Sequence, residues 1–287
     1  MRILPRFSSG ARASDGFSLV ELSVVIAIMS VMATFGLEMA ANYLNRTATS
    51  ISRERMVTVD EAIAQFFSVY GRLPCPALKT TAPTTTTYGL EDCTITILTS
   101  TTIGGGLLAG AVPFRTLNLP MMYSLDGFTN KVNYVVTKNL TLAGVDYTGQ
   151  FGYTGGDDTT NGVAGIEVRS GVLEQPCSTT KCQVLADPTT YTGAAYVLFT
   201  SGADQRGAIS DRGNTRNACA NTSAISDRRI DSQNCVFGSN TVRGYMNVNG
   251  VASTIPYNVF YDNRYNAGLN LSSYFDDAVI WRSKARL

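Results

Sequence analysis

Histidine is absent from all 287 residues, and this absence limits the chemistry open to the chain. Ser-His-Asp and Cys-His nucleophile pairs, zinc sites with imidazole ligands and histidine pH switches all need that side chain. Charge is also sparse, with 16% charged residues and a formal net charge of +1. The protein therefore has no global field that would attract nucleic acid or an acidic partner. Any catalysis would rest on carboxylates, Lys, Tyr or Ser, and no catalytic residue is predicted.

The six cysteines include no Cys-x-x-Cys pair, so in a chain without histidine they indicate disulfides rather than a metal site. Pairing in sequence order closes short loops and is the expected arrangement, although six cysteines allow other connectivities. Disulfides also imply that this part of the chain resides in an oxidising compartment. The expected bridges are Cys75–Cys93, Cys177–Cys182 and Cys219–Cys235.

The densest apolar run lies near the N-terminus. Residues 22–37 carry no charged side chain, and extension back to Phe17 gives 21 positions interrupted only by Glu21. At about 1.5 Å per residue this run reaches roughly 30 Å, the thickness of a bilayer core. Arg2, Arg6 and Arg12 precede it and are expected to stay in the cytoplasm. Hydropathy alone leaves two readings open, a secretory signal peptide and a single membrane anchor.

Glu21 lies well inside this run, where an acidic group costs about 2.5–3.5 kcal/mol at the centre of a membrane helix. A partner for its carboxylate is therefore expected, the alternative being an unpaired or protonated acid that reaches toward the membrane surface. The string from Gly16 to Leu22, Gly-Phe-Ser-Leu-Val-Glu-Leu, resembles the cleavage and methylation motif of type IV prepilins and type II secretion pseudopilins.

The resemblance implies a specific maturation pathway. A membrane peptidase would cut after Gly16, Phe17 would become the N-methylated first residue, and Glu21 would become the fifth. It also implies that the Glu21 carboxylate pairs with the Phe17 amine of a neighbouring subunit, which would offset the desolvation of both charges.

Beyond the apolar run, side chains at steps of three and four predict that the helix continues as an amphipathic one. No proline interrupts residues 17–70, and Gly71 followed by Pro74 is a typical end signal. The expected apolar stripe is Met56, Val59, Ile63, Phe66 and Tyr70. The polar faces are assigned to Arg53, Glu54, Arg55, Asp60, Glu61 and Gln65.

From residue 72 onward, short apolar segments alternate with loops rich in Gly, Asn, Asp and Thr. This pattern predicts an α+β fold, in which a long N-terminal helix packs on a C-terminal antiparallel β-sheet domain with long loops. The expected strands lie at residues 132–136, 195–199, 244–251 and 278–281. The expected domains are a leader peptide (1–16), the helix (17–71, with 17–37 as the transmembrane and assembly segment) and a globular β-rich domain (72–287).

The globular part resembles type II secretion major pseudopilins in three places: Asp126-Gly127-Phe128, the stretch from Tyr196 to Asp204, and Asp276-Asp277 before Trp281. About 70 residues separate Asp204 from Asp276 where those proteins have a short loop, so a plain major pseudopilin is not expected. The resemblance implies a Ca²⁺ site formed by Asp204, Asp276 and Asp277, because Ca²⁺ prefers carboxylate oxygens. The alternative is that these acids cap turns or face water.

The expected function is that of a structural subunit, a minor pilin or pseudopilin of a type IV pilus or type II secretion filament. Its expected partners are itself or other pilins, the prepilin peptidase and an inner-membrane assembly platform with its ATPase. The subunit is expected first in the inner membrane, with a periplasmic domain, and later in a periplasmic or surface filament. An exported enzyme with an ordinary signal peptide is another possibility.

The main alternative to a structural subunit is a filament-tip adhesin or DNA-binding pilin, which five arginines in one polar stretch suggest. Interleaved Asp residues nearly cancel their charge, so nucleic-acid binding is not expected. The arginines are Arg206, Arg212, Arg216, Arg228 and Arg229.

Overall fold

The computed structural model places two compact units along the chain, Met1–Asn45 and Arg46–Leu287, and one helix runs through the boundary between them. The structure describes residues 18–95, 106–143, 165–171, 182–187, 193–217, 234, 243–246, 252–255, 259–263, 275–283 and 287.

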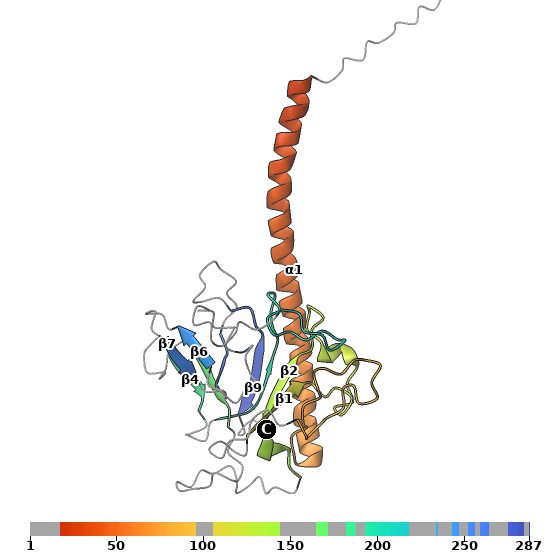
Figure 1. Cartoon of the computed structure of the whole chain (residues 1–287), viewed down its shortest axis with the longest axis vertical. Helices are drawn as coiled ribbons and strands as arrows, with labels where there is room; N and C mark the ends of the chain where they lie inside the picture. Colours follow the sequence, from red (N-terminus) through yellow and green to blue (C-terminus); the bar gives the residue numbers. More distant parts are fainter. Residues whose placement is uncertain are drawn as a thin grey trace, which may run out of the picture. The chain divides into compact units, whose positions relative to one another are not determined.

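Helix α1 spans Leu19–Tyr70, 52 residues without a break (Figure 1), which confirms the predicted long helix. No proline falls within it, so its backbone hydrogen bonds continue without interruption. Gly71 ends the helix with a φ of +61°, a conformation that glycine adopts without strain. Its N–H donates to the Phe67 carbonyl at 2.8 Å, which satisfies one of the last backbone carbonyls of the helix.

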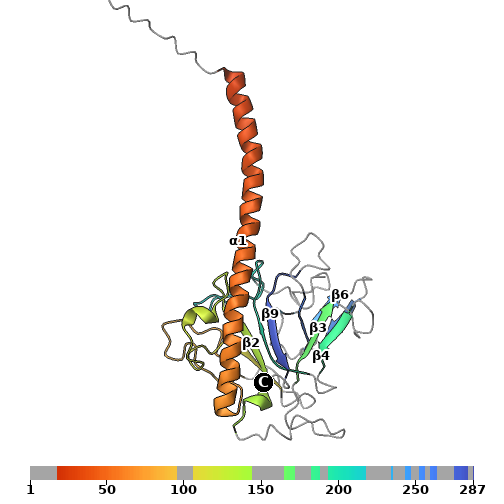
Figure 2. The same cartoon turned by 180° about the vertical axis from the view of Figure 1, so that it is seen from behind.

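The main sheet has four antiparallel strands in the order β1-β2-β5-β9. Its centre is formed by β2 and β5, in which Val135 lies opposite Val197. The C-terminal half of α1 lies beside this sheet in both views (Figure 1, Figure 2), which confirms the predicted α+β fold. The strands are β1 (Leu107–Ala111), β2 (Asn133–Thr137), β5 (Ala194–Phe199) and β9 (Val279–Ser283).

A smaller sheet has the order β4-β3-β8, and β6 and β7 pair with each other in a two-stranded sheet. In the smaller sheet the β3–β8 pair is parallel, whereas every other strand pair in the described residues is antiparallel. Two 3₁₀ helices are short: Met121–Ser124 lies between β1 and β2, and Lys138–Thr141 directly follows β2. The additional strands are β3 (Glu167–Gly171), β4 (Cys182–Ala186), β6 (Arg243–Met246), β7 (Ala252–Ile255) and β8 (Val259–Tyr261).

Both faces of the main sheet are covered. One face packs against the stripe of α1 that the sequence predicts, and Met56, Val59 and Ile63 are fully buried there. The other face packs against the smaller sheet through side chains such as Val197 and Phe260. Coverage on both sides explains why β1, β2 and β5 are buried at every position rather than at every second one.

Tyr70, the last member of the predicted stripe, is 62% exposed. Its ring still packs on Phe66, which is buried, with centroids 4.4 Å apart. The stripe is therefore confirmed for its first four members. The prediction is wrong for Tyr70, because the helix ends there and the sheet no longer covers that side.

Asp60 corrects the sequence analysis, which assigns this residue to the polar faces of the helix. The side chain is buried against the sheet, where it accepts a hydrogen bond from the Tyr196 hydroxyl at 2.5 Å. The guanidinium of Arg282, on β9, donates to both of its oxygens at 2.7–2.9 Å. Burial, and then the charge of Asp60, raises the pKa of Tyr196, so this hydroxyl keeps its proton. The three groups join the helix to two strands.

We predict that Asp60→Ala destabilises the globular unit by about 3 kcal/mol, because it leaves Arg282 and the Tyr196 hydroxyl without their acceptor in a largely buried site. Urea unfolding of the full chain in detergent, followed by the fluorescence of Trp281, measures the loss. Glu61→Ala, at the exposed next position, is the control and changes stability by no more than about 0.5 kcal/mol. Equal losses in the two variants would contradict the prediction.

Candidate assembly helix and its attachment to the globular domain

The first half of α1 exposes its apolar side chains. Leu19, Ile26 and Met32 are 86%, 56% and 70% exposed. In the part of the chain that the structure describes, α1 is the one helix long and apolar enough to cross a membrane. An exposed apolar surface of this length requires a lipid or protein environment, because water would solvate it at a large cost in free energy.

The hydroxyl groups of this segment are satisfied within the helix. Ser23, Ser30 and Thr34 donate to the Val20, Ile26 and Ser30 carbonyls at 2.7, 2.6 and 2.9 Å. These side chains can therefore enter an apolar environment without leaving a hydrogen-bond donor unpaired.

Glu21 differs from the hydroxyls. It is the only ionisable side chain between residues 18 and 37. It is exposed in the first turn of α1, where the helix dipole favours a negative charge. Among the described residues it has no hydrogen-bond or ion-pair partner, so its carboxylate remains available to another molecule. Gly16 and Phe17, the predicted processing site, lie outside the described residues.

The Asp126-Gly127 turn attaches the globular domain to the second half of α1. The Gly127 N–H donates to the Ser52 hydroxyl at 2.9 Å. A Cβ on Gly127 would lie 2.1 Å from the Ala48 carbonyl oxygen, so only glycine permits this approach. Arg55, which the sequence analysis assigns to a polar face, is half-buried and donates to the Leu125 and Asp126 carbonyls at 3.0 and 2.9 Å.

The carboxylate of Asp126 holds this turn from inside. Its Oδ1 accepts hydrogen bonds from the N–H groups of Phe128 and Asn130 at 2.9 and 2.8 Å. Asp126 is fully buried, and burial raises the pKa of its carboxyl group to about 6 despite these hydrogen bonds. The charged form is therefore stabilised poorly at neutral pH.

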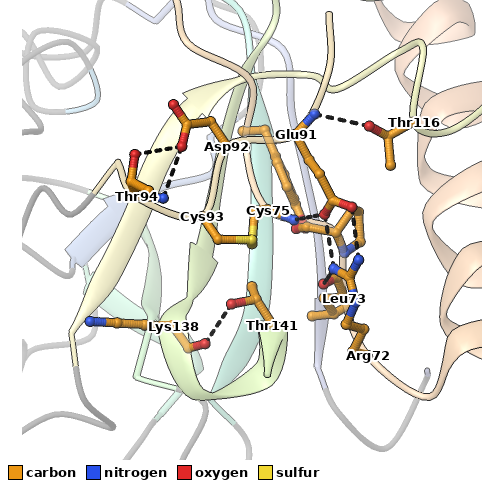
Figure 3. Close-up of a disulfide and its surroundings, with 12 residues drawn as sticks. Arg72, Leu73, Cys75, Glu91, Asp92, Cys93, Thr94, Thr116, Lys138 and Thr141 are labelled. Carbon is orange, nitrogen blue, oxygen red and sulfur yellow. Dashed lines mark hydrogen bonds and ion pairs between the residues drawn. A yellow bond between two sulfur atoms is a disulfide. The ribbon is translucent and has the colours of Figure 1, made fainter. Parts of the chain in front are cut away.

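A disulfide closes the loop that follows α1. Cys75 and Cys93 are joined (Figure 3), in agreement with the pairing expected from the sequence. Beside it, Arg72 donates to both oxygens of Glu91 at 2.7–2.8 Å, and the Cys75 N–H donates to the same carboxylate at 2.9 Å. Burial acts to raise the pKa of Glu91, but these hydrogen bonds outweigh it and lower the pKa.

Cys75, Glu91 and Cys93 are the one group of three potential metal ligands within the described ranges. The two sulfurs are bonded to each other and the carboxylate is held by Arg72, so this group serves to close the loop. Cys182 is also disulfide-bonded. Cys177, Cys219 and Cys235 lie outside those ranges as well, and the pairings expected for them stay predictions.

The three aspartates expected to hold Ca²⁺ have protein partners. Asp276 Oδ2 accepts hydrogen bonds from the N–H groups of Ala203 and Asp204 at 2.6 and 3.0 Å. Asp204 forms an ion pair with Arg206 at 3.2 Å, and Asp277 accepts a hydrogen bond from Asn234 at 3.2 Å. The hydrogen bonds and the ion pair of these acids therefore connect segments of the loops, and a role in Ca²⁺ binding stays a prediction.

Two of the five arginines considered for DNA binding, Arg212 and Arg216, are exposed. Arg206 is paired with Asp204, and Arg228 and Arg229 lie outside the described residues. The described part of the stretch therefore presents two exposed basic side chains rather than five.

Comparison with known proteins addresses the N-terminal segment. Residues 11–37 match the family model of the prokaryotic N-terminal methylation motif. The chain carries the type IV pilin and pseudopilin signature. No curated protein and no solved structure matches the chain. The signature describes a precursor of a pilin-like or pseudopilin-like structural subunit, which a prepilin peptidase processes and which assembles with other pilins.

We predict that Asp126→Asn removes a pH dependence from the stability of the globular unit. The folded-state pKa of about 6 lies above the ordinary value of 3.8, so folding favours the protonated acid. Wild-type stability should therefore fall as the pH rises from 4 to 7, by about 2 kcal/mol relative to the variant. Urea unfolding followed by Trp281 fluorescence at pH 4, 5, 6 and 7 measures this difference. A difference that does not change with pH would contradict the assignment.

Proposed function

We propose that the chain is a structural subunit of a type IV pilus or type II secretion filament, processed after Gly16 and assembled through α1. The observation that carries the proposal is the state of Glu21. It is the only ionisable group in an exposed apolar segment whose hydroxyl groups are already hydrogen-bonded, and it lies within the matched methylation motif.

Cleavage after Gly16 would create the missing partner. The new amine of Phe17 and the Glu21 carboxylate would each cost several kcal/mol if moved alone into an apolar filament core. Pairing the carboxylate of one subunit with the amine of the next offsets both penalties and fixes the position of the subunits along the filament. This gives processing a direct physical role in assembly.

The orientation follows from the charges before the helix. Arg2, Arg6 and Arg12 favour a cytoplasmic N-terminus, which puts the globular domain in the periplasm. The Cys75–Cys93 disulfide supports this side of the membrane, since disulfides persist in oxidising compartments. The size of the globular part, with a second sheet behind the first, favours a minor subunit. An inner-membrane platform with its ATPase would drive insertion into the filament.

We predict that Gly16→Val blocks processing, because a branched side chain replaces the residue that the peptidase must accommodate at the cleaved bond. Mass spectrometry of the N-terminal peptide from membranes of the source cells is the measurement. Wild-type chain should begin with N-methyl-Phe17, and the variant should retain its leader. Gly10→Val, within the same leader, is the control and should be processed normally. A wild-type chain that begins at Met1, or near Ala41 as expected if an ordinary signal peptide were removed, would refute the proposed function.

Glu21→Ala separates processing from assembly. The variant should still begin with N-methyl-Phe17, but its amount in the sheared filament fraction should fall at least about tenfold, because the neighbour's amine would be buried unpaired. Ser23→Ala is the control on the same helix, because the Ser23 hydroxyl is bonded within its own helix. Filament incorporation that is equal in Glu21→Ala and wild type would show that the carboxylate has no role in assembly.

A further inference from the structure

Four charged side chains mark the exposed side of the second half of α1: Arg46, Arg53, Glu54 and Glu61. Residues seven apart are separated by almost two full turns, so each like-charged pair forms a line along the helix axis. The basic line and the acidic line lie roughly a quarter of a turn apart. Both lie away from the buried stripe that packs on the sheet.

None of these four side chains forms an ion pair within the part of the chain that the structure describes. The positions three and four residues away along the helix carry no opposite charge either. Arg53 acts on Asp262, and Glu61 acts on Arg282, only at longer range. The helix therefore presents two adjacent lines of opposite and unpaired charge to its surroundings.

We propose that this face binds a second copy of the chain, with Arg46 and Arg53 of one copy against Glu54 and Glu61 of the next. Each of these pairs joins residue i of one copy to residue i+8 of the next. The same shift of one helix along the other therefore brings both pairs together. The shift corresponds to a displacement of about 12 Å along the helix axis for two parallel helices. This interface rests on the proposed function and adds a partner, a register and a set of residues to it.

The geometry favours a filament over a closed ring. The two surfaces that meet are different, one basic and one acidic, so each copy contributes one surface to each of two neighbours. Where more than two copies adjoin, such a contact repeats from copy to copy, which is compatible with a minor subunit that occupies a short stretch of the filament. Because every repeat adds the same axial displacement, the series continues along an axis and does not close on itself. Val57, which is 46% exposed, lies between the two lines and would be covered by the neighbour.

The contact can be tested by photo-crosslinking in cells. With photoreactive p-benzoyl-phenylalanine in place of Val57, the full-length chain should form a crosslinked dimer with itself, identified by mass spectrometry. Arg53→Glu places a negative charge opposite Glu61 of the neighbour, and Glu61→Arg places a positive charge opposite Arg53 of the neighbour. Each single variant should lower the dimer yield at least about tenfold. The double variant, which restores opposite charges, should return the yield to within about twofold of the starting chain.

Co-expression of the two single variants gives an independent check. Two copies of the same variant place like charges opposite each other. One copy of each variant places opposite charges at positions 53 and 61 in either order, so the yield of the mixed crosslinked dimer should recover. Arg212→Glu makes the same change in net charge at an exposed loop position and is the matched control, with no loss expected.

Three results would overturn the interface with a second copy. They are an unchanged dimer yield in the single variants, a loss of yield that the double variant does not restore, and crosslinking only to a different protein. The N-terminal peptide of every variant is measured in the same samples. N-methyl-Phe17 in all of them shows that the proposed function stands when the interface fails, and its absence from the wild-type chain shows that the proposed function itself fails.

Discussion

The packing of the second half of α1 on the main sheet is the constraint on which the rest of the molecule depends. Met56, Val59 and Ile63 remove apolar surface from water, and Asp60 adds a hydrogen-bonded ion pair that is specific in direction. Apolar burial supplies most of the free energy but specifies rotation about the helix axis poorly, because it is not directional. The contacts of Asp60 on one side and of the Gly127 turn on another fix that rotation. Only with the rotation fixed do the charged lines of α1 point away from the sheet.

Local signals in the sequence predict the helix and its end. The apolar stripe, the absence of proline and Gly71 depend on residues a few positions apart, and the structure confirms them. The strands β2, β5 and β9 are also anticipated, because β-branched and aromatic residues concentrate there. Strand β1, with the sequence Leu-Leu-Ala-Gly-Ala, has weak β-propensity and becomes a strand through its pairing with β2. The parallel β3–β8 pair joins segments about 90 residues apart, which no local pattern reveals.

The residues that attach the helix could not be predicted for the same reason. Asp60 is polar and flanked by Glu61, so its sequence context is typical of a solvent-facing acid. Its partners Tyr196 and Arg282 lie 136 and 222 residues further along the chain. The Asp126-Gly127 turn is visible as a turn, but its role depends on Ser52, which precedes it by 75 residues. In each case the residue type is recorded in the sequence, and its function depends on a distant contact that only the fold supplies.

The two proposed contacts between subunits differ in register, and this difference restricts how they combine. Pairing of Glu21 with the Phe17 amine of a neighbour joins positions four residues apart, which is a displacement of about 6 Å along a helix axis. The charged lines join positions eight residues apart, or about 12 Å. A single pair of parallel helices cannot adopt both displacements with its contacts in register. A subunit in a helical filament, however, has neighbours at several axial displacements. We therefore assign the two contacts to different neighbours, so that the N-terminal pairing sets one step of the filament and the charged lines of α1 set another.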